Sequence, residues 1–526
     1  MKHPVLIPMV VLFSIFSFFP LSASETLSGF WWNDRVFYEI YVRAFQDSDG
    51  DGHGDLKGLI SRLDYLNDGN ANTSTDLGIT GIWLMPVFDA QSQHGYDILD
   101  YKTIDKDYGT LEDFKLFIQE AHKRGIKVIV DLVLNHTSHN HPWFKSALSD
   151  PLGQFGNYYR FSEANPNSFW RSVINSQPPK FFYAWFNPTM PDLNYENPAV
   201  TQYILDATRF WLENTGVDGY RLDAIKYLIE EGVQDENTPS THLWFKNFYK
   251  VVKASNPQAF TVGEVWDDLP TVLSYTGDEM DINFHFPLSS AIAESVSGGR
   301  ANPLLKVLKE TLTTFPKGQY ATFLRNHDQK RLMNEFKGNL NQSLQAAAIL
   351  LTLPGVPFLY YGEEIGLSLN RKGMQWDASS PNWGFTTGRV FSNGTQEKDA
   401  AFTVSAQTGD NKSLLSSYRR LIALRNSQPA LLKGDITLVE TGNPQVLAYL
   451  RSLGKQHFVV IHNLSEKTVI DYIIPLVNAD GLTGKTSMLY PEEISSLDLK
   501  KDPMGFFTGK PLGELPGRST HVFELK

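Results

Sequence analysis

The sequence contains no cysteine among its 526 residues. This absence excludes disulfide bonds and a lipid anchor on an N-terminal cysteine, so the fold must rest on its core and on any bound metal. The sequence also has fewer basic than acidic residues, with 47 lysines and arginines against 58 aspartates and glutamates, so its formal net charge is −11. A chain with this charge is not expected to bind nucleic acid or an anionic membrane.

Beyond its N-terminus the sequence lacks any apolar run long enough to span a bilayer. The one long apolar run, residues 5–21, precedes small residues at positions 22–24. This order is typical of a secretory signal peptide over residues 1–24. A membrane anchor is the alternative, which the short run and its two prolines, Pro8 and Pro20, disfavour. We therefore expect a secreted or periplasmic protein with no membrane anchor after cleavage.

The remaining chain alternates strand-like apolar runs with helix-like segments as far as about residue 430. The alternation gives eight strands, which predicts the α/β class and a (β/α)8 TIM barrel. Among these elements we predict strands over residues 35–42, 79–87 and 126–133, and helices over residues 56–66 and 200–214.

Two segments depart from that alternation. Residues 137–198 follow the third strand, are rich in proline, asparagine and aromatic residues, and lack helical periodicity. We expect them to form an inserted subdomain within a barrel domain that spans residues 25–430. Residues 431–526 show only strand and turn patterns, which predicts a C-terminal antiparallel β-sandwich domain.

Four acidic side chains lie at or just after the ends of four predicted strands: Asp131, Asp223, Glu264 and Asp328. The strands of a parallel barrel end at one rim, so these groups would line one mouth. Charged groups are costly to bury unless they are paired or used, so a shared carboxylate pocket favours a site that stabilises a cationic transition state. Three further polar side chains accompany them, namely Arg221, His136 and His327.

An aspartate- and glycine-rich loop follows the first predicted strand. It offers several hard oxygen ligands on one turn, which suits calcium. Its twelfth position is a glycine rather than the glutamate of an EF-hand, and a solvated acidic turn without metal is the alternative. The candidate ligands are the carboxylates of Asp47, Asp49, Asp51 and Asp55 and the carbonyl of His53.

A histidine cluster, His136, His139 and His141, offers a zinc site as a second metal hypothesis. Its spacing is irregular for a helix. We therefore interpret the last two histidines as surface-loop residues.

Four short motifs follow one another along the chain: DLVLNH at residues 131–136, GYRLDAIKY at 219–227, GEVW at 263–266 and FLRNHD at 323–328. In this order they resemble the motifs of the alpha-amylase family of glycoside hydrolases. The resemblance includes three further segments, GITGIWLMPV, MPDLN and GVPFLYYGEEIG, and covers the chain from about residue 30 to its end. The MPDLN segment is similar to the intermediate group between oligo-1,6-glucosidases and neopullulanases.

The resemblance implies a role for each matching residue. Asp223 would be the nucleophile, Glu264 the general acid/base, and Asp328 a third carboxylate that binds sugar hydroxyls. Asp131 and Asn135 would be mainly structural. The implied substrate contacts are Tyr96, Asp97, His136, Arg221, Lys226 and His327.

Cleavage of a glycosidic bond with retention places two requirements on Asp223 and Glu264. Retaining glycosidases hold their two carboxyl groups about 5–5.5 Å apart, which neighbouring barrel strands can supply. One carboxyl group must be protonated while the other is ionised. We expect Arg221 beside Asp223, and the apolar Val262 and Trp266 beside Glu264, to produce that difference.

Ala224 and Lys226, after the implied nucleophile, are similar to the residues of alpha-1,4-acting amylases. The resemblance therefore implies an alpha-amylase that binds calcium and cleaves internal alpha-1,4 bonds of starch and maltooligosaccharides with retention. From the predicted signal peptide we expect it to be exported, and we also expect a monomer. A same-fold alpha-glucosidase, a cyclomaltodextrinase or neopullulanase, and a glucanotransferase are the alternatives. More remote hypotheses are a non-catalytic sugar-binding relative and a zinc hydrolase.

Overall fold

The computed structural model describes most of the chain after the predicted signal peptide. Residues 1–24, the predicted signal peptide, lie outside the described residues. Within them, every helix is too short or too polar to cross a lipid bilayer. The described residues are 30–70, 73–174, 176, 178–390, 399–476, 485–491, 496–498, 500–501, 507–509 and 512–526.

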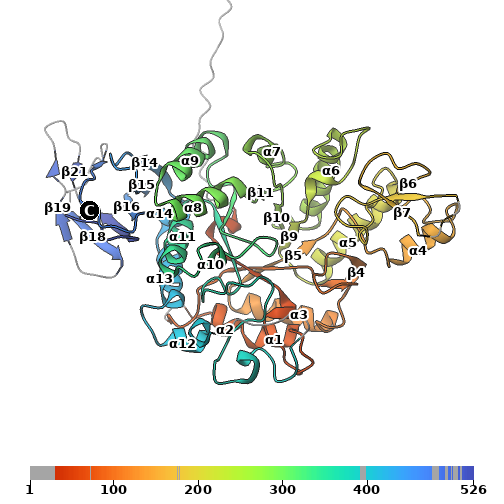
Figure 1. Cartoon of the computed structure of the whole chain (residues 1–526), viewed down its shortest axis with the longest axis horizontal. Helices are drawn as coiled ribbons and strands as arrows, with labels where there is room; N and C mark the ends of the chain where they lie inside the picture. The colour runs from red at the N-terminus through yellow and green to blue at the C-terminus, as the bar shows by residue number, and fades with distance from the viewer. Residues whose placement is uncertain are drawn as a thin grey trace, which may run out of the picture. The chain divides into compact units, whose positions relative to one another are not determined.

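Eight short parallel strands form one sheet in the order β11-β10-β9-β5-β2-β1-β13-β12, of which Figure 1 labels β5, β9, β10 and β11. A parallel bridge between Phe284 and Ala321 joins its two ends, and the N–H of His285 donates to the Ala321 carbonyl at 3.0 Å. This closure confirms the predicted (β/α)8 barrel. The strands are β1 (Phe37–Ile40), β2 (Gly81–Leu84), β5 (Lys127–Leu132), β9 (Gly219–Leu222), β10 (Phe260–Gly263), β11 (Ile282–Asn283), β12 (Ala321–Phe323) and β13 (Val356–Tyr360).

Helices alternate with these strands and begin at residues that cap them. At the start of α3, the Thr110 hydroxyl accepts the Asp113 N–H, and the Asp113 carboxylate accepts the Thr110 N–H, which forms a capping box. The longer helices are α3 (Leu111–Lys123), α5 (Pro198–Asn214), α6 (Pro239–Ser255), α8 (Phe286–Gly298), α9 (Asn302–Thr314), α11 (Leu340–Thr352) and α13 (Leu414–Ser427). The shorter ones are α1 (Leu56–Ser61), α2 (Leu63–Leu66), α7 (Leu269–Ser274), α10 (Leu332–Glu335), α12 (Val404–Thr408) and α14 (Pro429–Lys433).

Several predicted elements differ from the structure in length. The strand predicted over residues 35–42 is only β1, because a 3-10 helix begins at Val42. The helix predicted over residues 56–66 is two helices, α1 and α2, because the backbone of Arg62 leaves the helical region at φ −108° and ψ 4°. Helix α5 begins at Pro198, two residues earlier than expected, since a proline is well accommodated at the first helical position.

The segment after β5 contains more regular structure than its sequence predicts. Helix α4 (Pro142–Ser149) begins after His141, which is buried rather than at the surface as predicted, because its side chain caps this helix by accepting the N–H of Trp143. A three-stranded antiparallel sheet follows, made of β6 (Phe161–Ser162), β8 (Phe181–Tyr183) and β7 (Trp170–Ser172). A hairpin of β3 (Phe88–Ala90) and β4 (Ile98–Ile104), which the sequence did not predict, follows β2.

Aromatic side chains fill part of the barrel interior. The rings of Phe37 and Phe358 stack with centroids 4.6 Å apart, and Phe284 meets Phe358 at 4.9 Å. These residues belong to one buried cluster with Trp83 and Phe260. The barrel is therefore a packed core, and polar site residues have room only near its rims.

The C-terminal strands form antiparallel sheets, which confirms the predicted β domain as a fold element (Figure 1). Buried Arg451 of β15 donates to the Thr352 carbonyl at 2.5 Å, which ties the six-stranded sheet to the end of α11. By their contacts, Trp31–Lys526 form one unit, so the domain boundaries at residues 137, 198 and 431 stay predictions. The strands are β14 (Asp435–Val439), β15 (Val446–Leu453), β16 (Gln456–Asn463), β22 (Thr520–Leu525), β18 (Lys485–Tyr490), β19 (Ser496–Asp498), and, in a second sheet, β17 (Ile474–Leu476), β21 (Phe507–Gly509) and β20 (Lys500–Lys501).

Candidate active site

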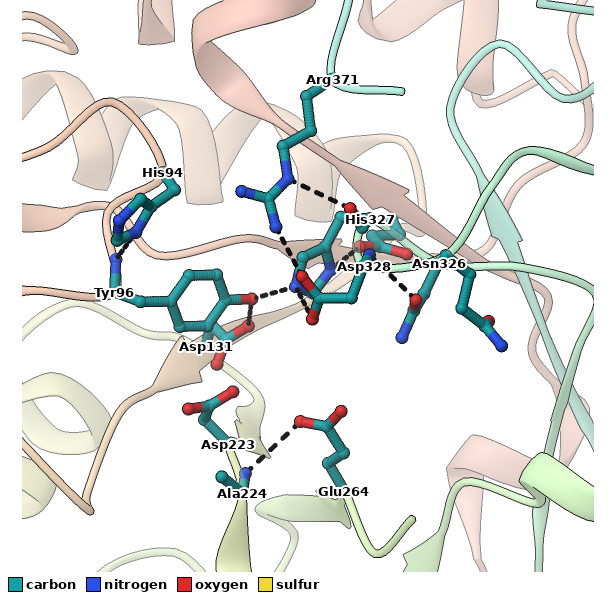
Figure 2. A network of polar contacts seen from close by, with 12 residues as sticks. His94, Tyr96, Asp131, Asp223, Ala224, Glu264, Asn326, His327, Asp328 and Arg371 are labelled. Atoms are coloured by element: carbon teal, nitrogen blue, oxygen red, sulfur yellow. Dashed lines mark hydrogen bonds and ion pairs between the residues drawn. The ribbon is translucent and has the colours of Figure 1, made fainter. Parts of the chain in front are cut away.

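The four predicted carboxylates come together at the C-terminal rim of the barrel. Asp131 lies in β5, Asp223 directly follows β9, and Glu264 directly follows β10. Asp328 lies in the loop after β12. Figure 2 shows the carboxylates of Asp223, Glu264 and Asp328 directed toward one common space, with the ring of Tyr96 at its edge.

Arg221 of β9 connects three of these carboxylates. It is fully buried, at 0% exposure, and its Nη1 lies 2.7 Å from Asp223 Oδ1 and 2.9 Å from Asp131 Oδ1. Its Nη2 contacts Glu264 Oε2. A guanidinium group presents several donors in a fixed plane, so one residue can orient acids from three neighbouring strands.

Burial gives the two central acids raised pKa values. It raises the pKa of Asp223 to about 6, against the opposing charge of Arg221. Burial raises the pKa of Glu264 further, to about 7, again opposed by Arg221 and reinforced by the negative charge of Asp223. Near neutral pH the pair can therefore hold one proton, with Glu264 as the acid and Asp223 as the base.

The reason predicted for this difference is wrong. Arg221 contacts both acids rather than Asp223 alone. Val262 belongs to the buried aromatic cluster of the barrel, and Trp266 is 53% exposed and stacks on Phe286. The higher pKa of Glu264 follows from burial and from neighbouring negative charge, not from an apolar wall of these two side chains.

Small residues position the backbone beside both acids. Gly263 precedes Glu264, and a Cβ atom there would lie 2.3 Å from Asn283 Oδ1. Ala224, which follows Asp223, adopts a left-handed conformation with φ 48° and ψ 40°. A non-glycine residue in this region is strained, and such strain often lies at functional sites.

His327 connects Asp328 to Tyr96. Its Nε2 is 2.9 Å from Asp328 Oδ2 and 2.6 Å from the Tyr96 hydroxyl, and the two rings stack at 5.3 Å. The Tyr96 hydroxyl also donates to Asp131 Oδ2 at 3.0 Å. Although burial alone would raise the pKa of Asp328, His327 and Arg371 lower it well below its usual value, so this carboxylate stays ionised.

The other predicted substrate contacts lie in different surroundings. Burial lowers the pKa of His136 to about 3, so its ring is neutral and packs 5.5 Å from that of Phe186. Buried Asp97 accepts hydrogen bonds from the N–H and the hydroxyl of Ser92. Lys226 does not contact the central carboxylates, because its ammonium pairs with Glu236 at 2.8 Å and Asp267 at 2.9 Å.

Sequence reasoning missed three residues of this cluster. Glu39 of β1 lies 2.6 Å from His327 Nδ1. Arg371 lies 2.6 Å from Asp328 Oδ1, and the Asn370 amide contacts the His327 carbonyl. No local pattern marks these residues, since their partners lie about 40 to 290 positions away and only the closed barrel brings them together.

Three of the five calcium ligands predicted in the acidic loop lie close together in the structure. Carboxylate oxygens of Asp47, Asp49 and Asp55 lie within 4.8 Å of one another. Asp51 stands outside that cluster and accepts the N–H of His53 at 2.7 Å. Several acidic oxygens this close suit a hard divalent cation.

A second group of buried oxygens lies where the inserted segment meets the barrel. Asn135 follows β5, and its carbonyl accepts the N–H of Leu193 at 2.9 Å. Burial and the nearby Glu230 raise the pKa of buried Asp192 well above its usual value, while the Asn135 side chain acts against this. A cation bound between Asn135 and Asp192 would offset the cost of burying this carboxylate.

Comparisons with known proteins agree with these features. A family described as "Alpha amylase, catalytic domain" matches residues 39–434. The chain is 37% identical over 450 residues to "Alpha-amylase 3" of Dictyoglomus thermophilum, covering 83% of this chain and 85% of that protein. It is 31% identical to the oligo-1,6-glucosidase of Parageobacillus thermoglucosidasius, covering 84% and 93%. Among solved structures, the alpha-amylase from H. orenii matches 94% of this chain and 99% of its own, with a TM-score of 0.77 and 35% identity.

Proposed function

Because this chain belongs to the alpha-amylase family of glycoside hydrolases, we propose that it cleaves internal alpha-1,4 bonds of starch and maltooligosaccharides with retention of configuration. One observation carries the proposal. Asp223 and Glu264 follow the paired strands β9 and β10 and contact the same guanidinium group. This arrangement gives an acid and a base on one side of the barrel mouth, as a two-step displacement requires.

In the first step, Glu264 donates its proton to the glycosidic oxygen as the bond from that oxygen to the anomeric carbon breaks. The carboxylate of Asp223 forms a bond to the same carbon, which gives a covalent glycosyl-enzyme. Glu264, now ionised, then takes a proton from water. The water oxygen attacks the anomeric carbon, the bond to Asp223 breaks, and two inversions give net retention.

Asp328 and its partners would bind the sugar that is cleaved. The ionised carboxylate accepts hydrogen bonds from sugar hydroxyls, and these bonds strengthen as positive charge develops on the ring. Tyr96 would contact the face of the same sugar. Its hydroxyl is held by Asp131 and His327, so the ring has a fixed position.

The products of maltoheptaose and soluble starch test this proposal. We expect maltooligosaccharides of several lengths at early times, with the alpha anomer formed first in the NMR spectrum. Release of glucose alone would favour an alpha-glucosidase. Trehalose would favour a trehalose synthase, which a relative at 36% identity over 80% of each chain also suggests. A beta anomer formed first would contradict the two-step mechanism.

We also propose that the acidic loop binds calcium through Asp47, Asp49 and Asp55. The spacing of these carboxylates supports the proposal. The ion would also fix the neighbouring loop, since the Thr386 hydroxyl donates to Asp47 Oδ2 and the Asp47 N–H donates to the Phe385 carbonyl. A second calcium ion would bind Asn135 and Asp192.

Removal of calcium is expected to lower the melting temperature by several degrees. An ion that binds only the folded state at a hundred times its dissociation constant contributes about 2.7 kcal/mol. Differential scanning calorimetry with and without EGTA measures the shift. Asp49→Asn should remove the part of the shift that belongs to the acidic loop, whereas Asp410→Asn, which changes another aspartate of similar local geometry, should remove none of it. Equal melting temperatures with and without chelator would reject both calcium sites.

We further propose that residues 1–24 direct export to the periplasm or the medium, and that the mature enzyme is a monomer whose partners are its glucan substrates. The apolar run followed by small residues supports the first part. N-terminal sequencing of the mature protein would test it, and a first residue before position 20 would contradict it.

A further inference from the structure

Glu39 is a buried carboxylate that the two-step mechanism does not use. It is the third residue of β1 and is 2% exposed. Its Oε1 lies 2.6 Å from Nδ1 of His327, a residue 288 positions later in the chain. An ionised carboxylate only accepts hydrogen bonds, so this contact requires a proton on Nδ1.

The other ring nitrogen of His327 faces the site. Its Nε2 is 2.9 Å from Asp328 Oδ2 and 2.6 Å from the Tyr96 hydroxyl. Burial raises the pKa of Asp328, but its Oδ1 lies 2.6 Å from Nη2 of Arg371, whose positive charge lowers that pKa and favours the ionised carboxylate. A second proton on Nε2 therefore satisfies both carboxylates, and the ring is an imidazolium between them.

The charges around His327 are consistent with this state. Burial lowers the pKa of His327, but Asp328 and Glu39 raise it to about 10, so the net effect is upward. The ring also lies edge-on to Trp83 at 5.8 Å. The titratable and charged groups that face it are Glu39, His94, Tyr96, Asp131, Glu264, Asp328 and Arg371.

We propose that Glu39 is a positioning residue of the active site, which holds His327 doubly protonated so that its Nε2–H fixes the carboxylate of Asp328. The inference rests on the proposed glycosidase function for its kinetic consequence. Its structural part, the protonation of both ring nitrogens, stands independently. Glu39 would act only through His327 and would not touch the substrate.

The test compares wild type with Glu39→Gln over a range of pH. The amide oxygen can still accept the Nδ1 proton, but the negative charge is lost. Loss of a neighbouring opposite charge lowers a pKa by roughly 1–3 units. The variant should therefore begin to lose its imidazolium between pH 6 and pH 9, where wild type keeps most of it.

The expected readout is the ratio of wild-type to variant kcat/KM on maltoheptaose. Both enzymes titrate Glu264, so the ratio removes that titration except for the part that the charge of His327, which lowers the pKa of Glu264, contributes. The ratio should rise from pH 6 to pH 9 by about twofold for a one-unit fall in the His327 pKa and by about a hundredfold for a three-unit fall. A ratio that does not change with pH would overturn the proposal.

Glu364→Gln is the matched control. Glu364 is also fully buried, and it accepts hydrogen bonds from Tyr38 at 2.8 Å and Tyr65 at 2.6 Å rather than from His327. Both variants neutralise a buried carboxylate and can lower stability. Only Glu39→Gln should change the pH dependence of activity, and the same change in Glu364→Gln would overturn the proposal.

A measurement on wild type covers the case in which Glu39→Gln does not fold. A neutron crystal structure at pH 7 should show deuterium on both Nδ1 and Nε2 of His327. A bare Nδ1 would overturn the proposal without any variant. If wild type instead fails to cleave maltoheptaose, the proposed function fails, whereas the neutron result still decides the protonation of His327.

Discussion

Glu264→Gln is expected to abolish turnover of maltoheptaose while the protein stays folded. The amide has nearly the shape of the acid, but it cannot donate a proton to the leaving oxygen. General acid catalysis contributes about 10²–10⁴-fold, so kcat should fall by at least that factor. Arg221 keeps its contacts with Asp131 and Asp223, so the free energy of unfolding should change little.

Two controls separate chemistry from folding in this experiment. Glu363→Gln changes a carboxyl group whose pKa burial raises to about 8, but that group accepts from Tyr418 and lies outside the carboxylate cluster, so activity should persist. A maltoside with a nitrophenol leaving group needs little protonation, so it should restore part of the first step in Glu264→Gln. A near-normal rate on maltoheptaose would reject Glu264 as the acid.

Much of the barrel could be predicted because its strands are buried on both faces. Continuous apolar runs such as those of β2 and β5 stand out in the sequence, and Asp131, Asp223 and Glu264 follow from the strand ends. The predicted strands that correspond to β1, β2 and β5 were too long by one to three residues at each end. The length of a strand depends on how far its neighbour pairs with it. The pairing of β1 with β2, for example, stops at Ile40 and Leu84, and the local sequence does not encode this limit.

The rest of the site depends on contacts between distant segments. Glu39 is a single acidic residue in a short apolar strand, so sequence alone does not show that it contacts His327. Arg371 belongs to a loop with no periodic pattern, and its left-handed backbone, φ 52°, has no glycine to mark it. Similarly, the proximity of Arg221 to Asp223 in sequence concealed its second contact with Glu264 from the adjacent strand.

Arg221→Met is expected to destabilise the protein and to remove activity at neutral pH. The substitution leaves Asp131, which is 0% exposed, and the partly covered Asp223 and Glu264 without their shared cation. Removal of one partner of a buried ion pair typically costs about 3–5 kcal/mol. Arg221→Lys is the matched control. It keeps the charge but not the planar group, so it should be more stable than Arg221→Met yet still impaired.

The pH dependence of the Arg221 variants follows from the sign of the interaction. Arg221 lowers the pKa of Asp223, which burial raises to about 6, so its loss should raise that pKa by roughly 1–3 units. The nucleophile is then protonated at pH 7, and the acidic limb of kcat/KM moves to higher pH in Arg221→Met but much less in Arg221→Lys. An unchanged acidic limb in Arg221→Met would show that Arg221 does not control the nucleophile.

The free energy of unfolding of Arg221→Met should also depend on pH, because the substitution raises the pKa values of Asp223 and Glu264. A carboxyl group whose pKa is higher in the folded state binds more protons there, so folding stability falls as pH rises through the interval between its two pKa values. Without Arg221 this interval widens for Asp223 and Glu264, because Arg221 lowers both pKa values. The difference in unfolding free energy between wild type and Arg221→Met, measured by urea denaturation, should therefore be larger at pH 8 than at pH 5. A difference that does not grow over this range would mean that the guanidinium group does not stabilise the fold through the charges of the acids it joins.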